Sequence, residues 1–599
     1  MNRACLILLV GVGFCGCSPS AYVRDADRQV QAIVREREQK VLGYQPQVDP
    51  GDVERPLPSK KAYDPIPLSL MPPPQPSPME RQPIVEPQGP LGPELRWMEL
   101  PPVEMDTFPY DVSEARPGRG PTLGPAVPRL NVPQFGLFES IAYAVENSRS
   151  YRDQMDDLYR SALDVTLQRH LFEPRPFASL RYDFEGGQGD INYRSALTAT
   201  GAAGVRQRLP LGGEIVAQGL TSFVNALSDN LSDGESASIA ISGSIPLLRG
   251  AGLVNLEPLI QSERNVVYQV RAFESFRRSF VVDISGRYFR LLTLQQSVNN
   301  RRRNLANLTA FTEQMQELWN AGRLPNRLQV QQALQAKLTA QGALIDAMDA
   351  YNTALDEFKI ALGMPVEQPL DIVPVVLDVE VPKVQDEEAL ALARRFRLEL
   401  QTVRDRVEDA RRQVQVARNG LLPDLDIDAR AEVGNRDGTT VGAFDARTAT
   451  YGAGVTLDLP VDRVIERNRY RASLIDLAET QRRYEQSLAV VEADVRDSIR
   501  AIRSAQESLQ IQRRGIELAE TRLDFATELL RIGRPGVNAR DAIEAQSALL
   551  DAQDRYDRAK GQLQIRVLEY LRDTGLLRVD PKAGALGLAM DRGVRRSTE

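Results

Sequence analysis

A seven-residue repeat of mostly apolar side chains runs through the C-terminal half of the sequence. Its positions are Leu474, Gln481, Leu488, Val495, Ile502, Leu509, Ile516, Leu523 and Leu530. A period of seven held over so many turns is typical of helices that pack as a left-handed coiled coil. Because each residue adds 1.5 Å, a helix of about 60 residues is roughly 90 Å long. This repeat therefore predicts a rod rather than a globular domain.

The N-terminal half contains a second set of the same signals. A heptad line occupies Ile284, Leu291, Val298 and Leu305, and the turn sequence "GRLPN" at 322 is echoed by "GRPGVN" at 533. Long helices are expected over about 256–320 and 326–362, and again over about 463–532 and 539–574, each pair joined at one turn. The recurrence predicts an internal duplication.

Each half also contains strand-like alternation between its helices. In "FASLRYDFE", Ala178, Leu180, Tyr182 and Phe184 alternate with polar residues. Further strands are expected over 203–209, 213–224 and 236–247. In the second half, "LLPDLDIDARAEVG" opposes its apolar residues to Asp426, Asp428, Arg430 and Glu432, and "TYGAGVTLDLPV" gives another strand. Single helices are expected before each set of strands, over about 134–171 and 386–419.

One apolar and one polar face on so few strands favour a membrane barrel with lipid outside and water inside. A few strands cannot close a barrel alone, and lipid offers no partner for an open edge. The chain is therefore expected to oligomerise, with each copy contributing a share of the strands. A small soluble sheet beside a coiled coil is the alternative, because its strands would alternate in the same way.

The N-terminus has the features of an exported protein. Residues 1–17, "MNRACLILLVGVGFCGC", read as a secretory signal that ends at Cys17 in the manner of a bacterial lipoprotein. Ordinary signal cleavage beside an incidental cysteine is the alternative. A short amphipathic helix is expected over 18–43. Residues 44–133 hold more than half of the 38 prolines of the chain, which predicts an extended tether.

The composition argues against catalysis and against nucleic-acid binding. The chain of 599 residues has three cysteines, all within the first 17 residues, and one histidine, His170. A thiol nucleophile, a multi-histidine metal centre and a histidine-dependent triad are therefore disfavoured, and neither an enzyme nor a cofactor is expected. His170 is expected to cap a helix. The net charge is −7, with both signs interspersed, which gives no nucleic-acid signal.

The order of these motifs resembles that of the TolC-like outer-membrane efflux proteins. The resemblance covers roughly 135–575. It rests on "LLPDLDIDARAEVG" after a helix, "GAGVTLDLPVDR" before a long helix, "ALGMP" at 361–365 and the two turn sequences. It implies an α+β membrane protein: a homotrimer whose transmembrane β-barrel continues as an α-helical barrel in the periplasm. The implied function is a passive exit duct of a tripartite efflux pump or a type I secretion system, working with a periplasmic adaptor and an inner-membrane transporter.

The resemblance also implies two sites. The family's acidic ring at the periplasmic entrance matches Asp541 and Glu544, although a first-turn acid also stabilises a helix N-terminus by itself. The turns match the region where adaptors dock, and Leu324 and Val537 are expected to be exposed there, although such residues also cap helices. The docking residues are Gly322, Arg323, Leu324, Pro325, Asn326, Gly533, Arg534, Pro535, Gly536, Val537 and Asn538.

The chain departs from the family in one feature of its strands. The family usually has two strands in each half, whereas "GVRQRLPLGGEIVAQGLTSFV" predicts an additional hairpin in the first half. This hairpin is expected either to enlarge the barrel or to fold outside it.

The resulting division places a first repeat at 134–364, a connector at 365–385, a second repeat at 386–575 and a disordered tail at 576–599. The expected location is the outer membrane, with the helices in the periplasm and a lipid anchor at Cys17. A lipid-anchored periplasmic coiled-coil scaffold is the main alternative. An adaptor-type subunit is disfavoured because the helical hairpin occurs twice.

Overall fold

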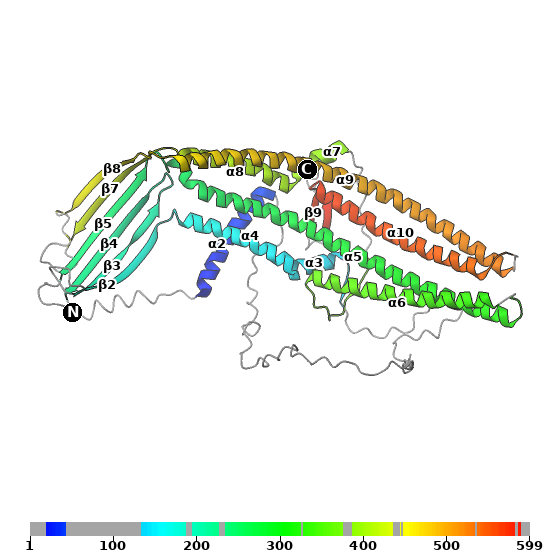
Figure 1. Ribbon diagram of the computed structural model, residues 1–599. Coiled ribbons are helices and arrows are strands. Elements are labelled where there is room, and N and C mark those ends of the chain that lie inside the picture. The colour runs from blue at the N-terminus through cyan, green and yellow to red at the C-terminus, as the bar shows by residue number, and fades with distance from the viewer. Residues whose placement is uncertain are drawn as a thin grey trace, which may run out of the picture.

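The computed structural model describes residues 19–42, 133–186, 195–226, 234–324, 327–374, 386–434, 444, 447, 449–532, 536–580 and 585–588. The signal sequence with Cys17, most of the proline-rich segment and the last eleven residues lie outside this part of the chain. Figure 1 shows an elongated molecule with a β-sheet at one end and paired helices running away from it. None of the helices in the described ranges has an apolar stretch long enough to cross a bilayer.

Two successive units share one order of elements. The first contains α3 (Leu137–Asn147), α4 (Arg149–His170), four strands, α5 (Glu257–Asn320) and α6 (Leu328–Leu362). The second contains α7 (Asp386–Phe396), α8 (Leu398–Asn419), two strands, α9 (Val464–Arg531) and α10 (Ala539–Asp573). Corresponding helices have matching lengths: 11 residues in α3 and α7, 22 in α4 and α8, and 35 in α6 and α10.

The single helix expected before each set of strands is wrong in both units. Each is broken after 11 residues by an extended residue, Ser148 (ψ 131°) in the first and Arg397 (ψ 115°) in the second. The break lies against a left-handed glycine, Gly363 (φ 79°) after α6 and Gly575 (φ 75°) after α10. A Cβ on Gly363 would lie 2.3 Å from the Asn147 carbonyl oxygen, so only glycine permits this contact.

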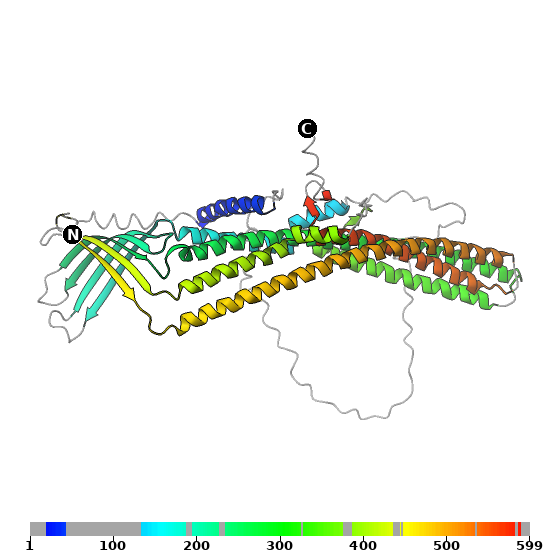
Figure 2. The same cartoon turned by 90° about the horizontal axis from the view of Figure 1, so that it is seen from above.

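The strands of both units form one antiparallel sheet. Its order is β2 (Arg175–Gly186), β3 (Ser195–Arg208), β4 (Glu214–Ala226), β5 (Gly234–Pro246), β7 (Asp424–Gly434) and β8 (Thr450–Asp458). The first unit supplies β2 to β5 and the second supplies β7 and β8, joined where β5 pairs with β7. Strand β3 is longer than expected, because it already begins at Ser195. Figure 2 shows the sheet as an open, curved continuation of the helical layer.

The hydrophobic core lies at the waist, where the helical hairpins meet the short helices. Phe280, Ile284, Phe358, Leu362 and Leu568 are among its buried members. A parallel bridge of β1 (Gln134–Phe135) with β6 (Asp371–Ile372) closes the first unit. The predicted heptad lines point into these seams: Ile284, Leu291, Val495 and Ile502 are all buried.

The expected disorder of the tail from 576 onward is wrong for its first part. Leu576 and Leu577 are buried at the waist, and β9 (Leu577–Asp580) pairs with β10 (Ala585–Leu588). Gly575 turns the chain out of α10, which lets these two leucines return to the core.

Helix α2 (Pro19–Leu42) lies across α4 and α5 (Figure 1). Its own residues Val30, Ile33 and Val34 are buried in the core, and its Arg37 pairs with Glu263 at 3.0 Å. The N-terminal segment is therefore attached to the helical layer close to the sheet.

Candidate functional site

One face of the sheet is apolar across its width, whereas the opposite face is mostly polar, with the exposed Leu220 of β4 as an exception. Residues paired in register lie on the same face, so Leu180 in β2 shares a face with Ile241 in β5 and Val455 in β8 through the intervening pairs. This face is uncovered: Leu180, Tyr182 and Phe184 are 56%, 65% and 66% exposed. The other exposed apolar residues of this face are Leu197, Val205, Ile215, Phe223, Ile239, Ile241, Ile245, Ile427, Tyr451, Val455 and Leu457.

The opposite face is polar and most highly charged on β7. Asp426, Asp428, Arg430 and Glu432 all lie on it, paired with Pro246, Ser244, Ser242 and Ala240 of β5. Thr456 of β8 donates a hydrogen bond to Asp428 at 3.2 Å. The predicted alternation in β7 is therefore present, and this strand has one apolar and one charged face.

The helices beneath the sheet form a layer with two open sides. Near the sheet, α4 packs on α5, α5 on α8 and α8 on α9. Farther away, α6 packs on α5, α5 on α10 and α10 on α9. Flank A consists of β2, α4 and α6, and flank B consists of β8 and α9. Each flank contains one edge strand of the sheet and the outer helices of the layer.

Both flanks carry apolar residues that no described part of the chain covers. On α9 and its C-cap residue, the exposed residues Ile511, Leu518, Phe525 and Ile532 repeat every seven positions. On α6 the exposed residues are Leu334, Leu338, Ile345 and Met348, which follow the spacing of a coiled-coil seam. Sequence analysis found only the buried heptad line of α9. The second line, two residues further on, is visible in the sequence once the first has been assigned.

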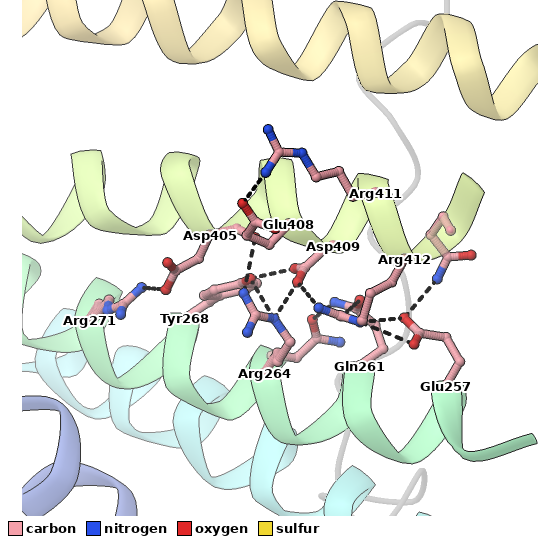
Figure 3. Close-up of polar contacts among 12 residues, drawn as sticks. Glu257, Gln261, Arg264, Tyr268, Arg271, Asp405, Glu408, Asp409, Arg411 and Arg412 are labelled. Atoms are coloured by element: carbon pink, nitrogen blue, oxygen red, sulfur yellow. Dashed lines mark hydrogen bonds and ion pairs between the residues drawn. The ribbon is translucent and has the colours of Figure 1, made fainter. Parts of the chain in front are cut away.

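A charged network joins the two units just below the sheet (Figure 3). Asp409 of α8 contacts Arg264 and Tyr268 of α5, and Arg412 lies 3.0 Å from Asp409 and 3.1 Å from Glu257. Burial, helped by Asp409, raises the pKa of Tyr268 to about 12, so its hydroxyl stays protonated as a donor. This network fixes the relative positions of the two units where helices become strands.

A second polar contact joins α5 to α10 in the far half. The side-chain amide of Asn300, which is buried, donates to Asp554 at 3.1 Å and to Asp557 at 3.2 Å. Ser297 also donates to Asp554 at 3.0 Å. Burial raises the pKa of Asp557, with a further contribution from the neighbouring Asp554 charge. The two hairpins are thus joined by hydrogen bonds from one buried amide to two carboxylates.

The hairpin turns lie at the end farthest from the sheet. Gly322 (φ 67°) and Gly536 (φ 92°) take the left-handed conformation, and the Arg323 amide donates to the Leu318 carbonyl at 2.9 Å, which caps α5. Pro325, Asn326, Gly533, Arg534 and Pro535 lie outside the described residues.

The expected exposure of the two apolar tip residues is wrong. Leu324 is half-buried because it packs against a small cluster around Met315, Val330 and Ala333. Val537 is half-buried as well. Leu324 therefore packs inside the end of the hairpin instead of forming an exposed apolar surface.

The two acidic residues of the second turn have local partners. Asp541 accepts a hydrogen bond from the Asn538 backbone amide at 2.8 Å, and the two form a reciprocal capping box at the start of α10. Glu544 pairs with Arg540 at 2.8 Å, and both acids are exposed. The helix-capping role that was the alternative for Asp541 is therefore present. An acidic ring would require the same residues from neighbouring copies.

An amphipathic sheet that continues into a layer of very long helices is also found in solved outer-membrane proteins. Three of them have this fold: the outer membrane protein VceC of Vibrio cholerae (13% identity, TM-score 0.56, 73% of this chain and 96% of that chain), the outer membrane channel CmeC of Campylobacter jejuni (13%, 0.57, 77% and 88%) and the outer membrane channel MtrE of Neisseria gonorrhoeae (13%, 0.53, 73% and 88%).

Residues 389–571, which run from α7 into α10, match the family model of the outer membrane efflux protein. The resemblance to the TolC-like efflux family is thereby confirmed: the second unit matches the model of that family, and the wider chain has the fold of the same solved proteins. No curated protein matches the sequence.

Proposed function

We propose that copies of this chain close into a passive exit duct, with the sheet in the outer membrane and the helices in the periplasm. The observation that supports the proposal is that each unpaired edge of the sheet lies on the same flank as an open side of the helical layer. Flank A and flank B are each incomplete in the sheet and in the helical layer at once. Flank B of one copy on flank A of the next satisfies the strand edges and the exposed heptad seams together. The family resemblance supports three copies.

The faces of the sheet give the orientation of the duct. The uncovered apolar face, with Tyr182 and Phe184, suits lipid, and the face with Asp426, Asp428 and Arg430 suits a water-filled lumen. Acylation at Cys17 would anchor the chain to the same membrane, consistent with the attachment of α2 near the sheet.

The ends of the helical hairpins are proposed to meet the rest of an export system. A periplasmic adaptor would dock on the tip residues around Gly322 and Gly536, and an inner-membrane transporter would supply the energy for efflux or type I secretion. Three copies of Asp541 and Glu544 would bring six carboxylates to the entrance, which attract cations. No nucleic acid, cofactor or catalytic step takes part in this function.

A membrane extraction experiment tests the proposal against a lipid-anchored periplasmic scaffold. The variant Cys17→Ala, exported with a cleavable signal, should stay in the membrane through carbonate and urea washes and leave it only with detergent, as a trimer. A scaffold held by its lipid alone would appear in the soluble fraction.

Conductance in a planar bilayer tests the duct itself. The purified oligomer should give discrete cation-selective steps. The double variant Asp541→Ala/Glu544→Ala should conduct more and select less. Unchanged selectivity would reject the acidic entrance, whereas absence of conductance from a stable oligomer would reject the duct.

A further inference from the structure

The β3–β4 hairpin is an integral part of the sheet rather than an appended loop. β3 pairs with β2 from Arg206↔Arg175 to Ser195↔Gly186, and β4 pairs with β5 from Glu214↔Ser244 to Val224↔Gly234. Both strands of the hairpin are therefore held on both sides along most of their length, and neither is an edge.

The turn of this hairpin is fixed to the helical layer. Gly212 (φ 105°) and Gly213 (φ 87°) form it, and a Cβ on Gly213 would lie 2.0 Å from the Ser244 carbonyl oxygen. The Gly252 amide donates to the Leu211 carbonyl at 2.7 Å, and the Asn255 side-chain amide donates to the Leu209 carbonyl at 2.8 Å. The turn of the hairpin is thus hydrogen-bonded to residues 252–256, which lie directly before α5.

The width of the sheet matches the width of the helical layer only if the hairpin is included. Strands about 4.8 Å apart and tilted by about 40° each occupy about 6.3 Å of circumference, so six strands span about 38 Å and four span about 25 Å. Four helices packed at about 8–10 Å span about 32–40 Å. The six-stranded sheet and the four-helix layer therefore subtend the same arc in each copy, whatever the number of copies.

The two edge strands are complementary to each other. β2 leaves the end of α4 and runs away from the helices, whereas β8 returns to the start of α9, so the two edges are antiparallel. The edge of β8 in one copy can therefore pair with β2 of the next copy, and every pair of neighbouring strands around the barrel remains antiparallel. The occupant of both edges is thus a second copy of this chain.

Resting on the proposed trimeric duct, we propose that the β3–β4 hairpin enlarges the barrel to 18 strands, so that the membrane section is as wide as the helical section. Eighteen strands correspond to a backbone diameter of about 36 Å, against about 24 Å for twelve. The membrane section is then no narrower than the helical section, and it does not restrict the passage of bulky hydrated solutes. Size selection is left to the hairpin ends.

Cysteine cross-linking tests the strand order in the full-length chain. All native cysteines lie within the first 17 residues, so introduced pairs have little background. Leu180→Cys or Tyr182→Cys, each combined with Ala453→Cys or Val455→Cys, should give at least one disulfide between copies. The β7–β8 pair Ala429→Cys/Ala453→Cys, which is in register, controls for access of the oxidant.

The pair Leu180→Cys/Ile241→Cys reports the competing arrangement. β2 and β5 lie three strand spacings apart, about 14 Å, which is beyond disulfide reach. A disulfide in this pair would mean that the hairpin has left the sheet and would overturn the proposal. Failure of every β2–β8 pair while the β7–β8 control forms would overturn it as well.

Polymer exclusion measures the width. Polyethylene glycols of increasing size are added on the extracellular side of a planar bilayer that contains the oligomer. Deleting residues 195–226 removes β3 and β4 and leaves β2 and β5 antiparallel. Polymers that enter the wild-type barrel should be excluded by this variant, whose barrel cross-section falls about twofold.

Two readouts keep the proposal separate from the proposed function. If the deletion variant does not fold, the strand count in an electron cryomicroscopy map of the wild-type oligomer decides: 18 strands in three copies support the proposal, and 12 overturn it. Cross-linked β2–β8 edges in an oligomer that never conducts would reject the duct and leave the closure intact.

Discussion

The exposed heptad line of α9 gives the sharpest prediction. Leu518 and Phe525 are 72% and 66% exposed in a single copy and lie on flank B. If this flank packs on a neighbouring copy, the double variant Leu518→Ala/Phe525→Ala removes apolar burial from the contact between copies. It leaves the fold of each copy intact, because alanine is a good helix former.

The magnitude follows from the exposed fractions. Full burial of such a side chain is worth about 1.5–3 kcal/mol, so these two residues contribute about 2–4 kcal/mol to each contact. A closed ring of three copies contains three contacts, and the double variant should therefore lose about 6–12 kcal/mol of assembly free energy. A loss of this size should turn a detergent-stable trimer into a monomer at micromolar concentration.

The assay is the oligomeric state in detergent, by light scattering over a range of protein concentrations, together with the helix content and the melting temperature of the monomer. Leu253→Ala is the matched control, because Leu253 is 77% exposed but lies outside both flanks. A trimer of unchanged stability in the double variant, or equal weakening by the control, would refute the assignment of flank B.

Three further predictions concern the polar contacts. Asp409→Asn should lower the free energy of unfolding by about 2–3 kcal/mol, because two arginines lose a largely buried carboxylate; a melting curve that matches the wild type would exclude a stabilising role for this network. Asp557→Asn should flatten the pH dependence of stability just above the ordinary aspartate pKa: the folded-state pKa is raised, so the wild type binds the proton more tightly when folded and loses stability as pH rises through that range. Denaturant titrations from pH 4 to 7 check the sign, and an unaltered slope would contradict it. Asp541→Ala should cost about 1 kcal/mol by loss of the helix cap, whereas Glu544→Gln should change ion selectivity alone; bilayer recordings beside melting curves separate the two roles.

The parts of the fold that sequence predicted are those set by local periodicity. The seven-residue repeat gave the long helices to within a few residues, and alternation assigned the faces of β7 and β8, because successive side chains of a strand point to opposite faces. The breaks at Ser148 and Arg397 were missed. They depend on the close approach of Gly363 and Gly575, which lie far away in the sequence.

The candidate site was harder to predict, because the environment of its residues is set by elements that are distant in the sequence. The charged residues of β7 were recognised from their spacing. The apolar residues of the tips were misjudged, since Leu324 is drawn into a cluster formed by both hairpins. The exposed heptad line of α9 was also missed. It lies only two residues from the first line, so in the sequence both lines look like one wide apolar stripe, and only the burial of the side chains distinguishes them.

The structural and sequence arguments meet at the junction between strands and helices. A barrel and a helical tube of similar circumference can be joined by short segments that run directly from each strand to the helix below it. The charged contacts of Glu257, Asp409 and Arg412 hold α5 against α8 at this level, and the Gly212–Gly213 turn rests on the start of α5. Four helices with four strands would leave about 13 Å of helical arc in each copy without strands above it. In the proposed barrel the additional hairpin fills that arc.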